Sequence, residues 1–286
     1  MPDRKVSTLK EIKRRIPLGE IELVGVTYSM GDGINRITDI RRVKNRGVLH
    51  GKAGEVVGVG RMVYDEIASS ELRAVVIPGL HRDVEALDPR FRALYSHCAS
   101  AEKVSLSYHS YLKVKVENMI ISDISSNTVT IGIKDGRFLG AMDACLGAFG
   151  LVHGPLDLEA LRRVDQGAIT GNEAFYSSGV RKISQRDDLD GILDPKSDQQ
   201  KLARRALIMS VQMEVNGFLS LIESDAFVIT GWVGVRSSIF KEIKSAFEKF
   251  APVYMVDGYA AAKGSAEIAR DVLRGRKDFL GIKMDF

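Results

Sequence analysis

The sequence has few cysteines, no long apolar run and little net charge, and each of these shortages excludes a class of protein. Cys98 and Cys145 are the only cysteines and no Cys-x-x-Cys occurs, so we expect no cysteine-ligated zinc or iron–sulfur site within one chain. No apolar run approaches the roughly 18–20 residues that a membrane helix needs. The formal charge of +4, from 41 basic and 37 acidic residues, is too small to indicate a nucleic-acid-binding protein.

Length and composition predict a globular α/β protein. The 286 residues, 45% of them apolar, suffice for one large domain or two medium ones. Two plain thiols and a charged N-terminus favour a cytoplasmic location over secretion. Strands come first and strand–helix alternation follows, which predicts mixed sheets covered by helices. We place the domain boundary near residue 115, giving domains 1–115 and 116–286, with a helical insertion at about residues 155–225.

The most informative stretch runs from residue 118 to residue 150. It reads as an apolar strand that delivers Asp123 to a polar turn, then a second strand and, after Asp135-Gly136, a third. The Asp-Gly pair predicts a hairpin because it tolerates the positive φ of a two-residue turn. The hydroxyls and backbone N–H groups of the polar turn could hold a phosphate, or the turn could simply join two strands. Its residues are Ser125, Ser126, Asn127 and Thr128.

Four further polar residues are candidates for function. Asp123 could position a metal-bound water or polarise a nucleophile, or it could cap the turn that follows. Asp32 and His81 each follow a predicted buried strand, where active-site residues are common in α/β folds, although both could be ordinary loop residues. Arg46, in a basic stretch that reads more readily as a solvated face, is a candidate clamp for a phosphate or carboxylate.

Other patterns are less specific. The stretch 199–222 predicts a long helix with apolar side chains near one face: Leu202, Ala206, Met209, Met213 and Phe218. Gly58-Val59-Gly60 is too incomplete for a dinucleotide fingerprint, and the chain has no P-loop motif. His81 and His97 lack the spacing of metal ligands on one helix face, so we predict no zinc site.

Two segments resemble acetate and butyrate kinases of the actin-like ATPase superfamily, in which two ribonuclease-H-like domains clamp ATP. The hairpin at 118–150 with Gly154-Pro155-Leu156-Asp157 resembles their second phosphate segment and adjoining loop. The segment from Phe227 to Gly234 resembles their adenosine segment, a strand that ends in glycines so that the backbone can approach the nucleotide. The resemblance implies that Ser125 to Thr128 hold phosphates, and that Gly231 and Gly234 border the nucleoside.

A closer resemblance, to the methanogenesis marker protein 12 family, covers almost the whole chain. It implies a methanogenic archaeon and a cytoplasmic protein, and no reaction is established for that family. Six separated segments carry it in order: Tyr28 to Gly33, Asn45 to Val48, Pro78 to His81, Tyr95 to His97, Asp123 to Thr130 and Gly154 to Glu159.

The chain departs from the superfamily pattern in three places. It has no opening hairpin with an Asp-x-Gly-Thr-Thr turn, so we expect a first domain that lacks its opening strands. Either the start was assigned at an internal methionine, which we favour, or the first phosphate loop is lost. Trp232 stands where acyl kinases often have a second glycine, and it could stack on adenine or block the pocket. Acyl kinases also place an arginine near the residue equivalent to His153, and its absence puts an acyl-phosphate substrate in doubt.

The leading hypothesis is an ATP-dependent phosphotransferase or ATPase of the acetate-kinase-like type, with ATP and Mg²⁺ in the cleft between two domains. Asp123 would orient the metal or the attacking group, and His153 and Asp157 would belong to the substrate loop. The alternative is a non-enzymatic, nucleotide-responsive binding or assembly protein in methanogens. We expect a small-molecule or protein substrate, no nucleic acid and no membrane. A homodimer is considered because many acyl kinases are dimers.

Overall fold

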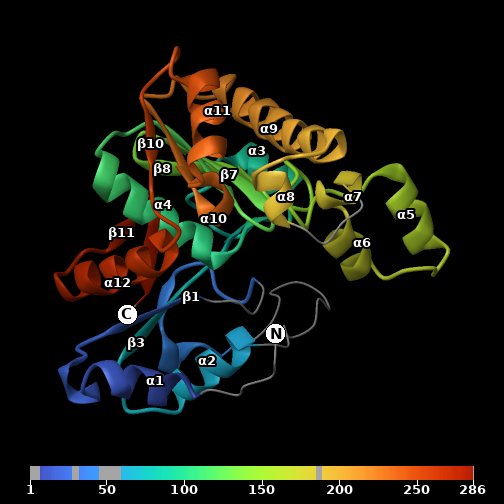
Figure 1. Ribbon diagram of the computed structural model, residues 1–286. Coiled ribbons are helices and arrows are strands. Elements are labelled where there is room, and N and C mark those ends of the chain that lie inside the picture. Colours follow the sequence, from blue (N-terminus) through green and yellow to red (C-terminus); the bar gives the residue numbers. More distant parts are fainter. Residues whose placement is uncertain (1–6, 28–31, 45–58, 185–188, 286) are drawn as a thin grey trace. The chain divides into compact units, whose positions relative to one another are not determined.

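The computed structural model describes residues 7–27, 32–44, 59–184 and 189–285. The chain divides into two compact units, one made of Met1–His109 with Ala261–Phe286 and the other of Ser110–Ala260 (Figure 1). Each unit holds a mixed sheet flanked by helices, which confirms the predicted α/β class. The chain first passes from one unit to the other between His109 and Ser110, close to the boundary predicted at residue 115. The last helix and strands, which the sequence assigned to the second domain, group instead with the first unit.

The sheet of the first unit has five strands in the order β1-β3-β2-β12-β11. β1 runs parallel to β3, β3 antiparallel to β2, and β2 parallel to β12, so strands from both ends of the chain share one sheet. A separate antiparallel pair, β4–β5, follows β3. The strands are β1 (Val24–Thr27), β2 (Ile37–Asp39), β3 (Ala74–Ile77), β4 (Leu80–His81), β5 (His97–Ala99), β11 (Asp278–Phe279) and β12 (Ile282–Asp285).

The last helix, α12 (Ala260–Leu273), belongs with the first unit because two glycines let backbones approach closely. A Cβ at Gly25 on β1 would lie 2.2 Å from the carbonyl oxygen of Ser265, and a Cβ at Gly264 would lie 1.8 Å from that of Ser105. The buried Tyr108 hydroxyl also donates to Asp271 Oδ2 at 2.7 Å, which ties α4 to α12. The remaining helices here are α1 (Thr8–Arg15), η1 (Leu18–Glu20), η2 (Ile40–Arg42), α2 (Val59–Ala68), α3 (Pro89–Leu94) and α4 (Ala101–Val114).

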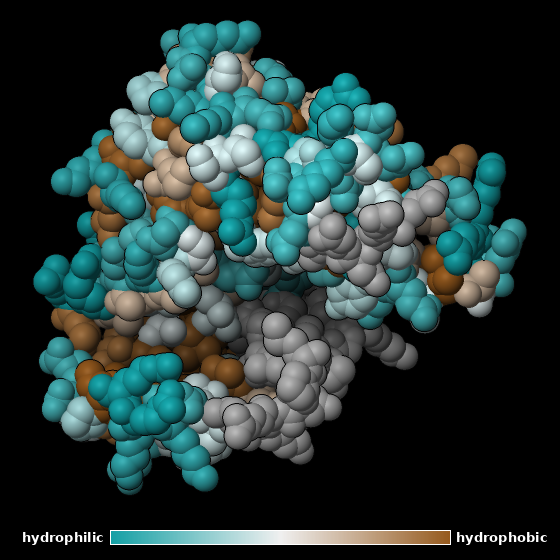
Figure 2. All heavy atoms as spheres, in the orientation of Figure 1, coloured by the Kyte–Doolittle hydropathy of each residue, from teal (hydrophilic) through white to brown (hydrophobic). Residues whose placement is uncertain are grey.

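β1 is an edge strand of this sheet among the described residues, and an apolar groove lies beside it. Figure 2 shows apolar side chains gathered in a hollow on this face. They come from α1, β1, α2 and α12, among them Ile12, Val24, Val26, Val63 and Ile67. Within the described part of the chain, no helix is both long enough and apolar enough to cross a membrane.

The sheet of the second unit has the order β10-β9-β6-β7-β8. β10, β9 and β6 are parallel, and β6, β7 and β8 form an antiparallel meander. Asp135 and Gly136, between β7 and β8, have φ of 52° and 67°, which confirms the predicted two-residue hairpin turn. The strands are β6 (Met119–Ile124), β7 (Thr128–Lys134), β8 (Arg137–Met142), β9 (Ala226–Thr230) and β10 (Val253–Met255).

Helices α5 to α9 lie between β8 and β9 in the chain, where the sequence predicted a helical insertion. α9 (Asp198–Leu219) packs on β6 and β7, and α11 (Ser237–Phe247) packs on β10 and α9 (Figure 1). The predicted apolar face of α9 was largely wrong, because Leu202, Met209 and Met213 are exposed and the buried face contains Leu207 and Val211. The shorter helices are α5 (Leu158–Asp165), α6 (Gly171–Ser177), α7 (Arg181–Ser184), α8 (Leu189–Leu193) and α10 (Gly231–Gly234).

Candidate functional site

Two parallel strands of the second unit end side by side, and candidate residues follow each of them. β6 and β9 pair so that Asp123 stands opposite Thr230, and both residues are buried. Ligand sites in α/β sheets commonly lie at the carboxyl ends of parallel strands, because the following loops leave the sheet at one edge. The polar turn after β6 and the glycine segment after β9 therefore start from the same edge.

Gly231 brings these two segments into direct contact. Its φ is +83°, a conformation that L-residues rarely adopt. A Cβ at this position would lie 2.2 Å from Asp123 Oδ1, 2.3 Å from the carbonyl oxygen of Ile124 and 2.6 Å from Ser125 Oγ. Only a residue without a side chain allows the backbone after β9 to lie against the carboxylate and the polar turn.

Asp123 has the surroundings of a residue that could help to hold Mg²⁺. It is 7% exposed, and its Oδ1 accepts a hydrogen bond from Ser125 Oγ at 3.1 Å. Mg²⁺ takes oxygen ligands and is usually held by one or two carboxylates, with water and phosphate completing the shell. Among the described residues, no three His, Cys, Asp or Glu side chains gather as a metal cluster. One buried carboxylate beside a hydroxyl is a donor set that could hold Mg²⁺ together with a phosphate.

The polar turn exposes three of its four residues. Ser125, Ser126 and Asn127 are partly exposed, and the Ser125 N–H donates to the Asn127 carbonyl at 2.8 Å. Thr128 is fully buried, and its hydroxyl donates to the carbonyl of Phe149 at 2.9 Å. A phosphate at this turn would therefore contact the first three residues, while the Thr128 hydroxyl fixes the turn from behind.

The loop after β8 supports the turn from behind. The N–H groups of Val152 and His153 donate to the carbonyl of Ser126 at 2.9 and 2.8 Å. A Cβ at Gly150 would lie 2.3 Å from the Cα of Asn127, so a glycine is needed for this contact. Residues 150–153 thus hold the backbone of the turn in one conformation, and the structure places His153 beside the predicted phosphate segment.

His153 lies among aromatic side chains. Its ring stacks on Phe175 with centroids 4.9 Å apart and lies 4.8 Å from the Tyr176 ring. Burial, helped by the nearby positive charge of Arg181, lowers the pKa of His153, which favours a neutral imidazole. The sequence shows no arginine next to His153 in the chain, whereas the fold supplies Arg181. This residue escaped sequence reasoning because its proximity depends on the packing of α7.

Asp157 and Arg46, the other predicted substrate residues, differ in what the structure shows. Asp157 caps α5: its Oδ1 accepts from the Ala160 N–H at 2.9 Å, and its Oδ2 pairs with Lys182 Nζ at 3.3 Å. The hydrogen bond from Ala160, followed by that from Lys182, lowers the pKa of Asp157. These contacts show a helix cap at an exposed position. Arg46 lies outside the described residues.

Trp232 and Gly234 occupy the first turn after β9. The Trp232 side chain is 39% exposed, so it could meet a ligand at the surface. Gly234 is buried, and a Cβ there would approach Ile229 Cγ2 at 3.0 Å and Ile124 Cβ at 3.3 Å. Gly234 therefore allows α10 to pack on both strand ends, whereas Gly231 contacts the polar turn itself.

Glu214 on α9 lies beneath this region and was not singled out by the sequence. Its Oε1 accepts from the Ala148 N–H at 3.0 Å, and it also accepts from the hydroxyl of Thr130. Its Oε2 is shielded from solvent and has no hydrogen-bond partner among the described residues. Burial raises the pKa of Glu214 to about 7. A Cβ at Gly147 would lie 1.8 Å from Oε1, so the loop after β8 closes directly over this carboxyl group.

The first unit places Asp32 beside a different histidine from the one the sequence favoured. Asp32 Oδ1 lies 2.9 Å from Nδ1 of His97 on β5. His81 is fully buried: its Nε2 lies 2.8 Å from the Ile34 carbonyl and its Nδ1 accepts from the Asp83 N–H at 3.4 Å. Both ring nitrogens of His81 therefore hold loops together, and this geometry suits a positioning role. Strand pairing, which sets His97 opposite His81, carried no local sequence signal.

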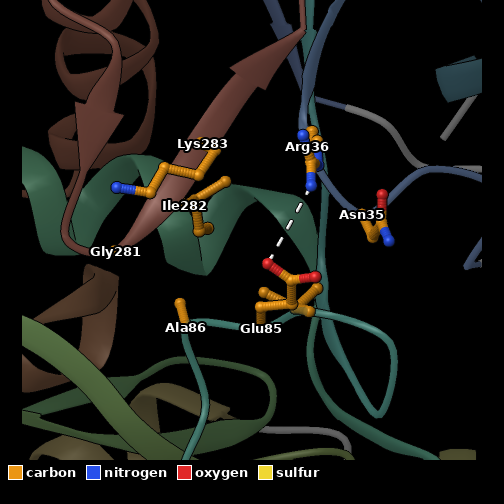
Figure 3. A pocket seen from close by; sticks show the side chains of 8 residues that line it. Asn35, Arg36, Glu85, Ala86, Gly281, Ile282 and Lys283 are labelled. Carbon is orange, nitrogen blue, oxygen red and sulfur yellow. Dashed lines mark ion pairs between the residues drawn. The ribbon is translucent and has the colours of Figure 1, made fainter.

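A small pocket in the first unit is lined by charged residues that already have partners. Figure 3 shows Arg36 directed at Glu85, with a nitrogen–oxygen distance of 3.9 Å. Lys283 on the other wall pairs with Asp278 at 2.6 Å. With its positive charges balanced in this way, the pocket offers little attraction for an anionic substrate.

The chain belongs to the UPF0285 family, which occurs in methanogens. It is 48% identical to a UPF0285 protein of Methanococcus vannielii, over 99% of this chain and 88% of that protein. It is 47% identical to one of Methanocaldococcus jannaschii, over 99% and 90%. No family model matches the chain.

Solved structures share the fold at low sequence identity. A propionate kinase of Francisella tularensis subsp. tularensis has a TM-score of 0.59 at 13% identity, over 90% of this chain and 82% of its own. Porphyromonas gingivalis acetate kinase has a TM-score of 0.57 at 14% identity, over 75% and 68%. The Lmo2764 protein of Listeria monocytogenes, suggested to be an N-acetylmannosamine kinase, has 0.53 at 9%, over 93% and 85%. The chain thus shares its fold with these three proteins.

Proposed function

We propose that this UPF0285 protein is a cytoplasmic, ATP-dependent phosphotransferase or ATPase, and that it is the methanogenesis marker protein its sequence resembles. The fold is shared with kinases named for two kinds of acceptor, the carboxylates acetate and propionate and the sugar derivative N-acetylmannosamine. Fold alone does not fix function, so the proposal depends on the site in the second unit.

The observation that carries the proposal is the contact between the ends of β6 and β9. Gly231 lies against Asp123 and Ser125 at a position where no side chain fits. Nucleotide phosphates are commonly bound by turns at which a glycine lets the backbone approach closely. In this proposal Ser125, Ser126 and Asn127 contact the phosphates, and α10 borders the nucleoside.

Asp123 would hold Mg²⁺, which would neutralise charge on the phosphate oxygens. The chain's own part is to bind and orient. The hydrogen bond from Ser125 keeps the Asp123 carboxylate directed at the turn. Thr128 and residues 150–153 keep the turn in one conformation, so binding requires little reorganisation. His153, kept neutral by burial and by Arg181, could hydrogen-bond a substrate without adding charge.

The test combines calorimetry with turnover of the purified protein. We expect ATP with Mg²⁺ to bind, and Asp123→Asn to lower ADP release by about 100-fold, the scale of a lost electrostatic group. Asp198→Asn is the matched control, because Asp198 is an exposed carboxylate at the start of α9. Wild-type protein that binds no ATP would contradict the proposal, and so would equal effects of the two substitutions.

A further inference from the structure

Two exposed aromatic side chains follow neighbouring parallel strands of the second unit. Trp232 comes two residues after the end of β9, and Tyr259 lies in the loop that follows β10. Trp232 is 39% exposed and Tyr259 76%, so both present aromatic surface to solvent. Covering an aromatic side chain removes a large apolar area from water, so two exposed ones at the same edge of a sheet indicate a ligand that covers both.

The backbone keeps the loops that carry these two residues side by side. Strand pairing continues past the end of β10, because the Val256 N–H donates to the carbonyl of Ile229 at 3.0 Å. One step further, the Thr230 hydroxyl donates to the carbonyl of Asp257 at 3.2 Å. Each aromatic residue therefore comes two positions after a residue that is bonded to the neighbouring loop.

Gly258 brings the second loop against the residue that carries the indole. A Cβ at Gly258 would lie 3.9 Å from the backbone nitrogen of Trp232 and 4.0 Å from its Cα. Asp257 Oδ1 accepts a hydrogen bond from the Tyr259 N–H at 2.9 Å, which holds this short turn in place. The backbone of Tyr259 is thus fixed one residue away from the approach to Trp232.

The two loops offer few groups that could read the edge of a base. Residues 231–234 and 256–259 contain one acid, Asp257, and no amide, lysine, arginine or histidine side chain. The acid already accepts from the Tyr259 N–H through Oδ1 and from Thr230 through its carbonyl. Strong discrimination requires hydrogen bonds to the edge of the base, whereas every base has a π-face that can stack.

We propose that Trp232 and Tyr259 bind the nucleobase by stacking, and that the protein accepts adenine and guanine nucleotides alike; this rests on the function proposed above. The strand order supports the assignment. β6, β9 and β10 are adjacent and parallel, so the polar turn, Trp232 and Tyr259 follow one another along one edge of the sheet. Neighbouring strands lie about 4.8 Å apart, so this edge extends over roughly 10 Å, which is the scale of one nucleotide.

The chain offers two matched controls for the tyrosine. Phe250 is also an exposed aromatic residue, at 54%, but it precedes β10, whereas Tyr259 follows it. Phe250→Ala therefore removes a similar aromatic surface at the opposite end of the same strand. Tyr259→Phe keeps the ring and removes only the hydroxyl, so it should preserve stacking.

The experiment measures the Kd of Mg-ATP and Mg-GTP for the full-length protein by calorimetry, together with the emission of Trp232, the only tryptophan. We expect the two Kd values to lie within about 10-fold of each other, and both nucleotides to change the emission because the base covers the indole. Tyr259→Ala should raise both Kd values by about 5- to 150-fold, the scale of one lost stacking contact. Tyr259→Phe and Phe250→Ala should stay within about 2-fold of the wild type.

Each other outcome overturns the inference. Mg-ATP that binds Tyr259→Ala as tightly as the wild type would show that the tyrosine does not cover the base, and unchanged emission of Trp232 would show the same for the indole. A larger difference between ATP and GTP would show that the edge of the base is read by hydrogen bonds. An equal loss of affinity in Phe250→Ala or Tyr259→Phe would show that stacking at this edge is not the cause. Calorimetry that detects no binding of either nucleotide to the wild type would instead refute the proposed function itself, and the inference with it.

Discussion

Gly231→Ala is the substitution for which the structure gives the clearest expectation. Gly231 is buried, has a φ of +83° and lies between the end of β9 and the polar turn. The added methyl group would meet Asp123 Oδ1 at 2.2 Å, the Ile124 carbonyl at 2.3 Å and Ser125 Oγ at 2.6 Å. The two side chains can rotate, but the carbonyl belongs to the backbone of β6 and cannot move without disturbing the sheet.

Two costs add up to the expected loss of stability. An L-residue at positive φ costs about 1–2 kcal/mol relative to glycine. Forcing an extra methyl group into a packed site typically costs about 1–3 kcal/mol. We therefore expect Gly231→Ala to lower the free energy of unfolding of the second unit by about 2–5 kcal/mol. Nucleotide binding should weaken as well, because the methyl group displaces Asp123 or Ser125.

Two other glycines separate these costs. Gly167 has a φ of +69° and would place a Cβ with nothing within 4 Å, so Gly167→Ala should show the backbone cost alone, about 1–2 kcal/mol. Gly217, inside α9, also has nothing within 4 Å and no positive φ. Gly217→Ala should stabilise the helix by up to about 1 kcal/mol, because alanine is the better helix former.

Urea unfolding followed by tryptophan fluorescence measures these differences. Trp232 is the only tryptophan of the chain, so its signal reports the second unit. The midpoint should shift while the slope with urea stays constant, as expected when stability alone changes. A Gly231→Ala protein as stable as Gly167→Ala would show that the backbone at Gly231 does not lie against the Ile124 carbonyl.

Two further predictions concern buried polar groups. Burial raises the pKa of Glu214 from 4.5 to about 7, so its contribution to stability is complete below pH 4.5 and is lost as the pH rises through 7. The Glu214→Gln variant has no charge to bury, so it should avoid a fall in the free energy of unfolding on the order of 3 kcal/mol between pH 4.5 and 8. The urea midpoints of variant and wild type should therefore move apart over this pH range, and a constant difference would contradict the prediction. Tyr108→Phe removes the donor to Asp271 and should cost about 1–3 kcal/mol, seen as a lower Tm; an unchanged Tm would contradict the tie between α4 and α12.

The sequence predicted the second unit well because its signals are local. Asp135-Gly136 specified a hairpin turn, and the strands on either side of it follow within a few residues. The end of β9 was marked by an apolar run, Ala226 to Ile229, that is followed by Thr230 and Gly231. These features depend on backbone conformation at single positions, which composition and turn chemistry reveal.

Predictions from the sequence were wrong where contacts between residues far apart in the chain determine the structure. The last helix was assigned to the second domain because no local sequence signal indicates that Gly264 will contact Ser105 or that β12 will pair with β2. The exposed face of α9 was also misjudged, because Met209 and Met213 have helical spacing but point away from the sheet. Periodicity predicts a helix, but the packing partner determines which of its faces is buried.

The pairing of Asp32 with His97 is also a long-range contact that no local sequence signal marks. His81 was therefore predicted as the acid or base instead. His81 ends β4 and His97 begins β5, and the antiparallel pairing of these two strands places the two histidines opposite each other. His81 is fully buried, whereas His97 is partly exposed and its Nδ1 lies beside Asp32. A sequence can mark strand ends, but the partner of each side chain depends on the sheet.

The two candidate sites share one physical plan, although each belongs to a separate unit. In both, an acid follows or ends one parallel strand and a glycine follows its neighbour: Asp123 with Gly231, and Asp32 with Gly79. In both, a Cβ on the glycine would approach a backbone carbonyl, at 2.3 Å for Gly231 and 2.9 Å for Gly79. Gly231 lies directly against the acid, Asp123. Gly79 lies instead against β5, the strand that carries His97, the partner of Asp32. Gly231 therefore sets how closely the backbone after β9 lies against Asp123 and the polar turn, and Gly79 sets how closely β5 lies to β3.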